Sequence, residues 1–134
     1  MEFSVPSVPP PDSSMSILDR LRRRFVAGPD DGRLGPTVDV ARAQELLRAG
    51  ATLLDVREDH EWKAGHAPAA VHVALGNIDS APRRLRKDRP VVVVCASGMR
   101  SRTAAKQLRG LGFDATSLSG GMAMWARAGG EVRR

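Results

Sequence analysis

The sequence predicts an α/β protein of three layers, α/β/α, in which helices cover both faces of a mainly parallel central sheet. From Thr37 onward, short apolar runs alternate with stretches of helical periodicity, which is the pattern of consecutive βαβ units. Val91 to Val94 are four consecutive valines, and only a strand covered on both faces tolerates such a run. The chain has 134 residues, of which 42% are hydrophobic, and this is the size and composition of one globular domain.

The first 35 residues stand apart from this pattern by their composition. Residues 1–14 are rich in Pro and Ser and poor in large apolar groups, which is typical of disorder. A short basic amphipathic helix is expected next, with these apolar side chains near one face: Ile17, Leu18, Leu21 and Phe25. This helix could dock to a membrane surface or to a partner, or it could be a frayed leader segment. The second interpretation is preferred. Residues 27–36 have the Gly, Pro and Asp content of a linker, so we expect a leader over 1–35 and the folded domain over 36–134.

The first predicted elements of the domain are a helix and a buried strand. Asp39 is a candidate N-cap, and Gly50 follows the end of the helix. The inward-facing residues of this helix are Ala43, Leu46 and Leu47. Residues 52–56 (TLLDV) are apolar and short, which predicts the strand.

The next elements are predicted to be short. Asp59 to Ala64 suits one or two helical turns that end at Gly65, and a second strand is expected around Val71 to Ala74. A helix is expected from Asn77 to Leu85.

The central strand of the predicted sheet is Val91 to Val94. A helix from Ser101 to Leu111 follows it, with alanine and leucine on one face. The last strand is Ala115 to Leu118, and the last helix, Gly121 to Ala128, packs Trp125 inward.

The most informative residue is Cys95, which falls at the carboxyl end of the valine strand and just before a helix. Ligands of open parallel sheets bind at this place. The helix N-terminus and the arginines Arg100 and Arg102 favour a thiolate, and Gly98 allows the loop to turn its N–H groups inward. A lone cysteine is more often a small buried apolar residue, but the loop that follows favours a nucleophile.

Four sequence motifs occur in order along residues 36–130. They are L-D-V-R-E at 54–58, E-W-x-x-G-H-x-P-x-A at 61–70, C-x-x-G-x-R-S at 95–101 and G-G-M-x-x-W at 120–125. In type, order and spacing they resemble the rhodanese (sulfurtransferase) superfamily, as a single-domain member. Ala67 and Ala69 replace the usual Ile and Gly of the second motif, which we expect to alter packing only.

The resemblance implies a rhodanese-like fold and a ping-pong transfer of sulfane sulfur through a persulfide on Cys95. Thiosulfate is the expected type of donor, and cyanide or a protein thiol is the expected acceptor. The loop expected to bind the donor and the persulfide consists of Ala96, Ser97, Gly98, Met99, Arg100 and Ser101. Its N–H groups would hold the persulfide anion, and Arg100 would orient the oxyanion of the donor.

Two other activities remain open at this point. Cysteine phosphatases have the longer C-x5-R loop, whereas Cys95 and Arg100 form C-x4-R, and an arsenate reductase would need a second cysteine that the chain lacks. A non-catalytic module that only carries sulfur, or only binds a partner, would have the same sequence. We therefore expect a thiosulfate sulfurtransferase and keep the carrier as the alternative.

Charge and the remaining polar residues add expectations about partners. Residues 83–109 carry nine basic residues against one acid, Asp88, which predicts a positive field that attracts a small anionic donor or an acidic protein partner. No aromatic residues interleave with them, so nucleic acid is not expected. Asp55 and Arg57 are interpreted as a structural pair.

No cofactor and no metal are expected. The histidines His60, His66 and His72 recur every six residues, a spacing that fits neither a helical nor a strand face, and no cysteine pair lies near them. With a single cysteine the chain forms no internal disulfide, and no secretory signal or membrane-spanning run is present. A reducing compartment is expected, with the cytoplasm as the default.

Overall fold

The computed structural model describes residues 33–134. The predicted leader and amphipathic helix fall on residues 1–32 and lie outside the described part. Among residues 33–134, no helix is both long enough and apolar enough to cross a membrane.

The core of the fold is a parallel sheet of five strands in the order β1-β5-β4-β2-β3. The strands are β1 (Thr37–Val38), β2 (Thr52–Asp55), β3 (Val71–His72), β4 (Val91–Val94) and β5 (Ala115–Leu118). The valine strand β4 lies in the middle, as predicted. Because all pairs are parallel, the carboxyl ends of the strands meet at one edge of the sheet, and their amino ends meet at the other.

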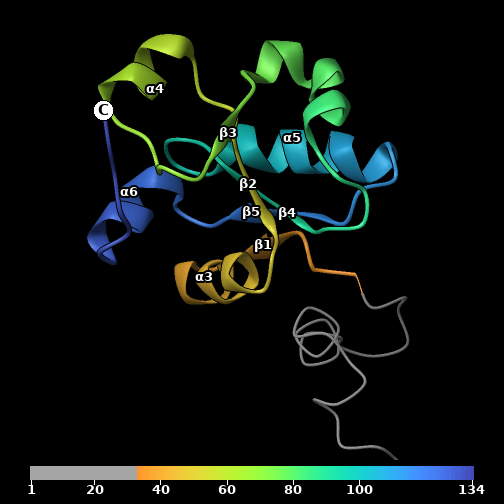
Figure 1. Ribbon diagram of the computed structural model, residues 1–134, viewed down its shortest axis with the longest axis horizontal. Coiled ribbons are helices and arrows are strands. Elements are labelled where there is room, and N and C mark those ends of the chain that lie inside the picture. The colour runs from red at the N-terminus through yellow and green to blue at the C-terminus, as the bar shows by residue number, and fades with distance from the viewer. Residues whose placement is uncertain (1–32) are drawn as a thin grey trace, which may run out of the picture.

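Helices cover both faces of this sheet and complete three layers (Figure 1). They are α3 (Val40–Arg48), α4 (Asp59–Ala64), the 3-10 helix η1 (Leu75–Arg84), α5 (Met99–Gly110) and α6 (Gly121–Arg127). In Figure 1, α5 and the green turns of η1 lie on one side of the sheet, and α3 lies on the other. This arrangement confirms the predicted α/β/α fold.

The side chains of β4 divide the core into two halves. Val91 and Val93 pack with residues of α5 and η1, whereas Val92 and Val94 pack with residues of α3 and α6. All four valines are fully buried, which is the reason that the run contains no polar residue. Cys95 continues the alternation and belongs to the α5 half.

Local sequence signals account for the helix starts near the sheet. The Asp39 side chain accepts a hydrogen bond from Arg42 N at 2.9 Å, which confirms the predicted cap of α3. Glu58 and Glu61 form a reciprocal capping box at the start of α4.

Three predictions about elements need correction. β1 was not predicted, because two residues carry no periodic signal. Asn77 to Leu85 is not an α-helix; η1 is 3-10, has a kink at Asn77 and contains Pro82, which lacks the N–H that an α-helix needs. α5 begins at Met99, two residues before the predicted start. Part of the predicted loop is therefore the first turn of a helix.

Candidate active site

Cys95 lies at the carboxyl end of the central strand and is 1% exposed. Its backbone follows Val94 directly, and only Ala96 to Gly98 separate it from α5. The β4 strand thus delivers the thiol to the N-terminus of a helix of twelve residues. This is the position that the sequence predicted for a nucleophile.

The sulfur of Cys95 sits in a cradle of hydrogen-bond donors. Gly98 N donates to Sγ at 3.0 Å and Ser101 N at 3.3 Å. The hydroxyl of Ser101 lies 3.4 Å from the same sulfur. Since no side chain caps α5, the sulfur itself takes the place of a capping acceptor for the N–H groups at the start of the helix.

Two glycines allow this loop its shape. Gly98 has a φ of +113°, and a Cβ at this position would come within 3.4 Å of Gly120 N. A Cβ on Gly121, whose φ is +56°, would overlap the carbonyl oxygens of Cys95 and Ala96. Met122 N donates to the carbonyl of Cys95 at 2.7 Å. The start of α6 therefore supports the cradle from behind, and it can do so only without a side chain at position 121.

A second serine extends the polar network behind the sulfur. The hydroxyls of Ser101 and Ser117 are 2.7 Å apart, and both residues are fully buried. Sequence reasoning named Ser101 but missed Ser117. The sequence does show a polar serine inside a buried strand. That this serine lies beside the sulfur site follows only from the register, which pairs Ser117 with Val93 of β4.

The surroundings of Cys95 lower the pKa of its thiol. Burial raises the pKa, but the hydrogen bonds from the Ser101 hydroxyl and from the N–H groups of Ser101, Gly98 and Ser97 outweigh it. The thiolate is therefore favoured, as the sequence predicted. Arg100 contributes as well, as the sequence predicted, because the Cys95 thiolate raises the pKa of Arg100 and this interaction is mutual. The largest effects that lower the pKa of Cys95 come from hydrogen bonds of the loop.

Arg100 points to a carboxylate that the sequence did not connect to it. Its Nη1 and Nη2 donate to the two carboxylate oxygens of Glu61 at 2.7 and 2.9 Å. This contact lowers the pKa of Glu61 to about 2 and raises that of Arg100. Among the other predicted loop residues, Ala96 is half-buried, while Ser97 and Met99 are exposed.

Comparison with known proteins identifies the family of this chain. The family model described as Rhodanese-like domain matches residues 39–128. The chain belongs to the rhodanese-like domain family. It is 44% identical over 90 residues to the putative sulfurtransferase YtwF of Bacillus subtilis, with 66% of this chain and 87% of that protein covered. It is 40% identical over 85 residues to the thiosulfate sulfurtransferase GlpE of Pseudomonas syringae pv. syringae, with 63% and 80% covered.

A solved structure supports the same assignment. The crystal structure of a rhodanese-related protein from Thermoplasma volcanium is similar with a TM-score of 0.67 and 27% identity, and the match covers 74% of this chain and 98% of that one. The predictions of the family and of the fold class are thus confirmed. The bacterial relatives named above are sulfurtransferases by name, which places the chain in a rhodanese-type sulfurtransferase family.

In this rhodanese-like domain, Asp55 and Arg57 form the buried pair that the sequence predicted. Arg57 Nη2 lies 2.8 Å from Asp55 Oδ2, and the two side chains are 9% and 0% exposed. Arg57 Nη2 also donates to the carbonyl of Gly65 at 2.7 Å. The pair therefore ties the end of β2 to the end of α4, and it is structural.

The basic residues of 83–109 do not form one field around the sulfur loop, and this corrects the prediction. Arg89 Nη1 donates to Gly50 O just before β2, and Arg109 Nη1 donates to Ala115 O at the start of β5. The ammonium of Lys87 lies 5.4 Å from the ring centre of Phe113, also before β5. These cations lie at the amino edge of the sheet, whereas Cys95 lies at the carboxyl edge.

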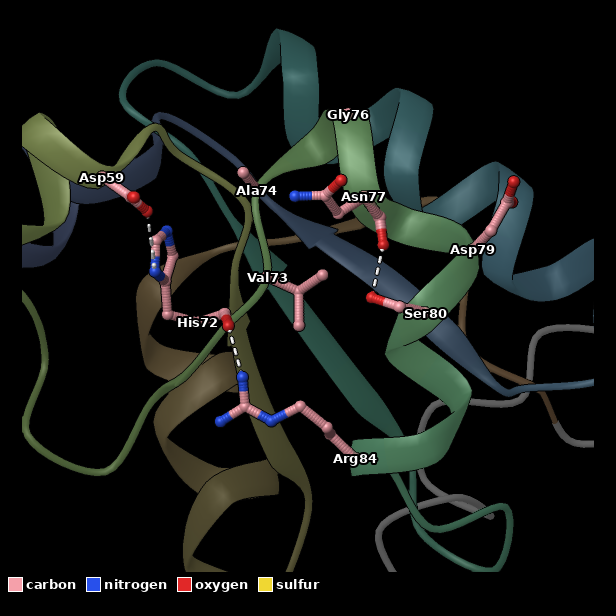
Figure 2. Close-up of a pocket in the computed structure, with 9 residues that line it drawn as sticks. All are labelled: Asp59, His72, Val73, Ala74, Gly76, Asn77, Asp79, Ser80 and Arg84. Atoms are coloured by element: carbon pink, nitrogen blue, oxygen red, sulfur yellow. Dashed lines mark hydrogen bonds and ion pairs between the residues drawn. The ribbon is translucent and has the colours of Figure 1, made fainter.

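An open pocket of about 430 Å³ lies between the start of α4, β3 and η1 (Figure 2). Its lining residues are Asp59, His72, Val73, Ala74, Gly76, Asn77, Asp79, Ser80 and Arg84. In this pocket His72 contacts two charged side chains. Its Nδ1 lies 3.8 Å from the Asp59 carboxylate, and its backbone carbonyl accepts a hydrogen bond from Arg84 (Figure 2). Within residues 33–134, no three His, Cys, Asp or Glu residues gather as metal ligands.

Proposed function

We propose that this rhodanese-like domain is a sulfurtransferase that carries a sulfane sulfur on Cys95. The observation that carries the proposal is the contact of Gly98 N and Ser101 N with the sulfur, at 3.0 and 3.3 Å. Backbone N–H groups aimed at one atom stabilise negative charge on it without any reorganisation. Similarity to the thiosulfate sulfurtransferase GlpE supports thiosulfate as the donor to test first.

In the first half-reaction, the Cys95 thiolate attacks the outer sulfur of thiosulfate. A new S–S bond forms at Cys95, the S–S bond of thiosulfate breaks, and sulfite leaves with the electron pair. The product is a persulfide whose outer sulfur carries the negative charge. In the second half-reaction a nucleophile, cyanide or a protein thiolate, takes that outer sulfur, and the Cys95 thiolate leaves.

The loop offers each half-reaction the groups it needs. When Cys95 is a thiol, its S–H can donate to the Ser101 hydroxyl, which itself donates to the carbonyl of Gly98 at 3.1 Å. When it is a thiolate, the Ser101 hydroxyl can turn toward the sulfur, and Ser117 can donate to Ser101 in its place. The lowered pKa of Cys95 increases its thiolate fraction over that of an ordinary thiol, and we propose that this thiolate reacts without a separate general base.

Charged groups outside the cradle are positioned to bind the sulfur donor. Arg102 is exposed on the first turn of α5, and Arg100 keeps N–H groups beyond the two that bind Glu61. We propose that these groups, with the helix N-terminus, meet the oxyanion of a small anionic donor. A protein that donates or accepts the sulfur would dock at the same edge. The free thiol suits a reducing compartment such as the cytoplasm.

The test is intact-protein mass spectrometry of the purified chain before and after thiosulfate, beside Cys95→Ser. We expect the wild type to gain the mass of one sulfur atom, to lose it on addition of cyanide and to release thiocyanate. Cys95→Ser should gain nothing. If the wild type stays unmodified, transfer from thiosulfate is excluded under those conditions. A persulfide that forms but reaches no acceptor would favour a sulfur carrier over an enzyme.

A further inference from the structure

The helix α4 lies at the same edge of the sheet as Cys95. None of its six residues is buried, so a few polar and aromatic contacts hold it in place. Trp62 is the largest apolar side chain of α4, and its indole stacks with two imidazoles. The ring centres of His66 and His72 lie 3.6 and 4.7 Å from it. This stack and the hydrogen bond of Arg57 to the carbonyl of Gly65 hold α4 in a fixed position relative to the sheet.

Glu61 connects α4 to the first turn of α5. Its carboxylate binds Arg100 with two hydrogen bonds, and Oε1 also accepts from Glu58 N at 2.9 Å. The side chains of Glu61 and Arg100 are 24% and 33% exposed. A bidentate pair with this partial burial is stronger than an ordinary surface ion pair.

The position of Arg100 allows this ion pair to influence the backbone N–H groups that contact the sulfur. Arg100 lies between Gly98 and Ser101, the two residues whose N–H groups donate to the sulfur of Cys95. A small rotation of the first turn of α5 would move both N–H groups away from Sγ. The ion pair of Glu61 with Arg100, called the clamp below, therefore keeps both N–H groups directed at the sulfur.

We propose that Glu61 is a positioning residue of the sulfur site, which holds Arg100 so that the N–H groups of Gly98 and Ser101 stay aimed at Cys95. The inference deepens the proposed function and rests on it for the chemistry of Cys95. The hydrogen bonds of the Glu61 carboxylate go to Arg100 and to Glu58 N, and not to the sulfur. Its effect reaches the thiolate through Arg100 and the backbone.

The experiment compares Glu61→Gln with Asp88→Asn. Asp88 forms a similar pair with Arg86 at the amino edge, with contacts of 3.0 and 2.8 Å, and serves as the matched control. Because Cys95 is the single cysteine of the chain, the pH midpoint of its alkylation by iodoacetamide reports its thiolate alone. Steady-state kcat and KM with thiosulfate and cyanide are measured on the same samples.

Glu61→Gln should raise the alkylation midpoint, and at a pH well below the midpoint each unit of that rise lowers the thiolate fraction about tenfold. kcat should fall with it. Arg100→Lys keeps the charge but not the bidentate contact, and it should shift the midpoint in the same direction by a smaller amount. Asp88→Asn should change neither quantity.

Unchanged midpoint and kcat in both Glu61→Gln and Arg100→Lys would overturn the proposal, whatever happens to the melting temperature. A lower melting temperature alone would mean that the pair is only structural. If the wild type takes up no sulfur while Glu61→Gln still shifts the midpoint, the proposed function fails and the clamp stands. The two failures are thus distinguishable.

Discussion

The two edges of the sheet carry arginine–carboxylate pairs of similar geometry in different surroundings. At the carboxyl edge, Arg100 and Glu61 are 2.7 Å apart at their closest and are 33% and 24% exposed. At the amino edge, Arg86 and Asp88 are 2.8 Å apart and are 64% and 63% exposed. The first pair joins two helices beside Cys95, whereas the second joins residues two positions apart in one loop. Position and burial, and not distance, distinguish a clamp from a surface contact.

The glycines at the two edges differ in the same way. Gly121 lies against the backbone of Cys95 and Ala96, which cannot move without opening the cradle. Gly112 at the amino edge also has a positive φ, of +98°, but the nearest atom to its absent Cβ is the ammonium of Lys87 at 3.2 Å. A flexible side chain can withdraw at little cost. Tight constraint is therefore concentrated on the side of the molecule that carries the thiol.

The largest expected effect comes from the buried pair at the carboxyl edge. Asp55→Asn leaves the Arg57 guanidinium buried without its counter-charge, and this should lower the free energy of unfolding by about 3–5 kcal/mol. Asp88→Asn should lower it by far less, because its pair is exposed and screened by solvent. Urea unfolding of the two variants measures both values. Equal losses of stability would show that burial does not distinguish the two ion pairs.

The next effect comes from the glycine behind the cradle. Gly121→Ala should abolish sulfur uptake and lower the free energy of unfolding by about 1–3 kcal/mol, because the new Cβ overlaps two carbonyl oxygens. Gly112→Ala strains φ as well, but it should leave uptake intact. Mass spectrometry after thiosulfate gives the uptake of each variant. Normal uptake by Gly121→Ala would show that the support from α6 is unnecessary.

A smaller effect is expected from the hydroxyl beside the sulfur. Ser101→Ala removes a hydrogen bond that lowers the pKa of Cys95, so the pKa should rise and the pH range of activity should shift upward. At a pH well below the pKa, a rise of one pKa unit would lower the rate about tenfold. The rate measured against pH tests this. A rate reduced equally at every pH would assign Ser101 a different role.

The smallest effect separates the cations of the two edges. Arg102→Gln should raise KM for thiosulfate by about twofold to fivefold, since an exposed charge near the site contributes about 1 kcal/mol or less. Lys87→Gln at the amino edge should leave KM unchanged. Kinetics at low and high salt check the electrostatic origin, because added salt should reduce the difference. An equal rise in both variants would mean that the whole field attracts the donor.

The parts of the fold that the sequence predicts well are those with a strong local signal. The valine run gives β4 and its central place, and Asp39 gives the start of α3. The nature of η1 was missed, because Pro82 and the kink at Asn77 interrupt a pattern that otherwise reads as helical.

In the candidate site, too, the residues that could be predicted are those with a local sequence signal. Cys95 and Gly98 follow from strand, loop and helix in sequence order. Ser117 needs the strand register, and the partnership of Glu61 with Arg100 spans 39 residues, so neither has a local signal. The spread of the basic residues over opposite edges also depends on the direction of β4, since residues before a strand and after it lie at its two ends.

Glu61 is not expected to limit activity at acidic pH. Its pKa falls from 4.5 to about 2 in the folded chain, so the contribution of the carboxylate to stability is complete above pH 4.5 and is lost as the pH falls toward 2. The acid limit of activity should therefore report Cys95.

The most direct test of a persulfide on Cys95 is the extent of sulfur uptake from thiosulfate by the intact chain, measured by mass spectrometry across pH. We expect a gain of one sulfur atom on Cys95, with a midpoint below the ordinary pKa of a free thiol, because hydrogen bonds of the loop stabilise the thiolate. Cys95→Ser should gain nothing at any pH. Uptake that persists in Cys95→Ser, or no uptake by the wild type at any pH, would show that Cys95 does not carry the sulfur.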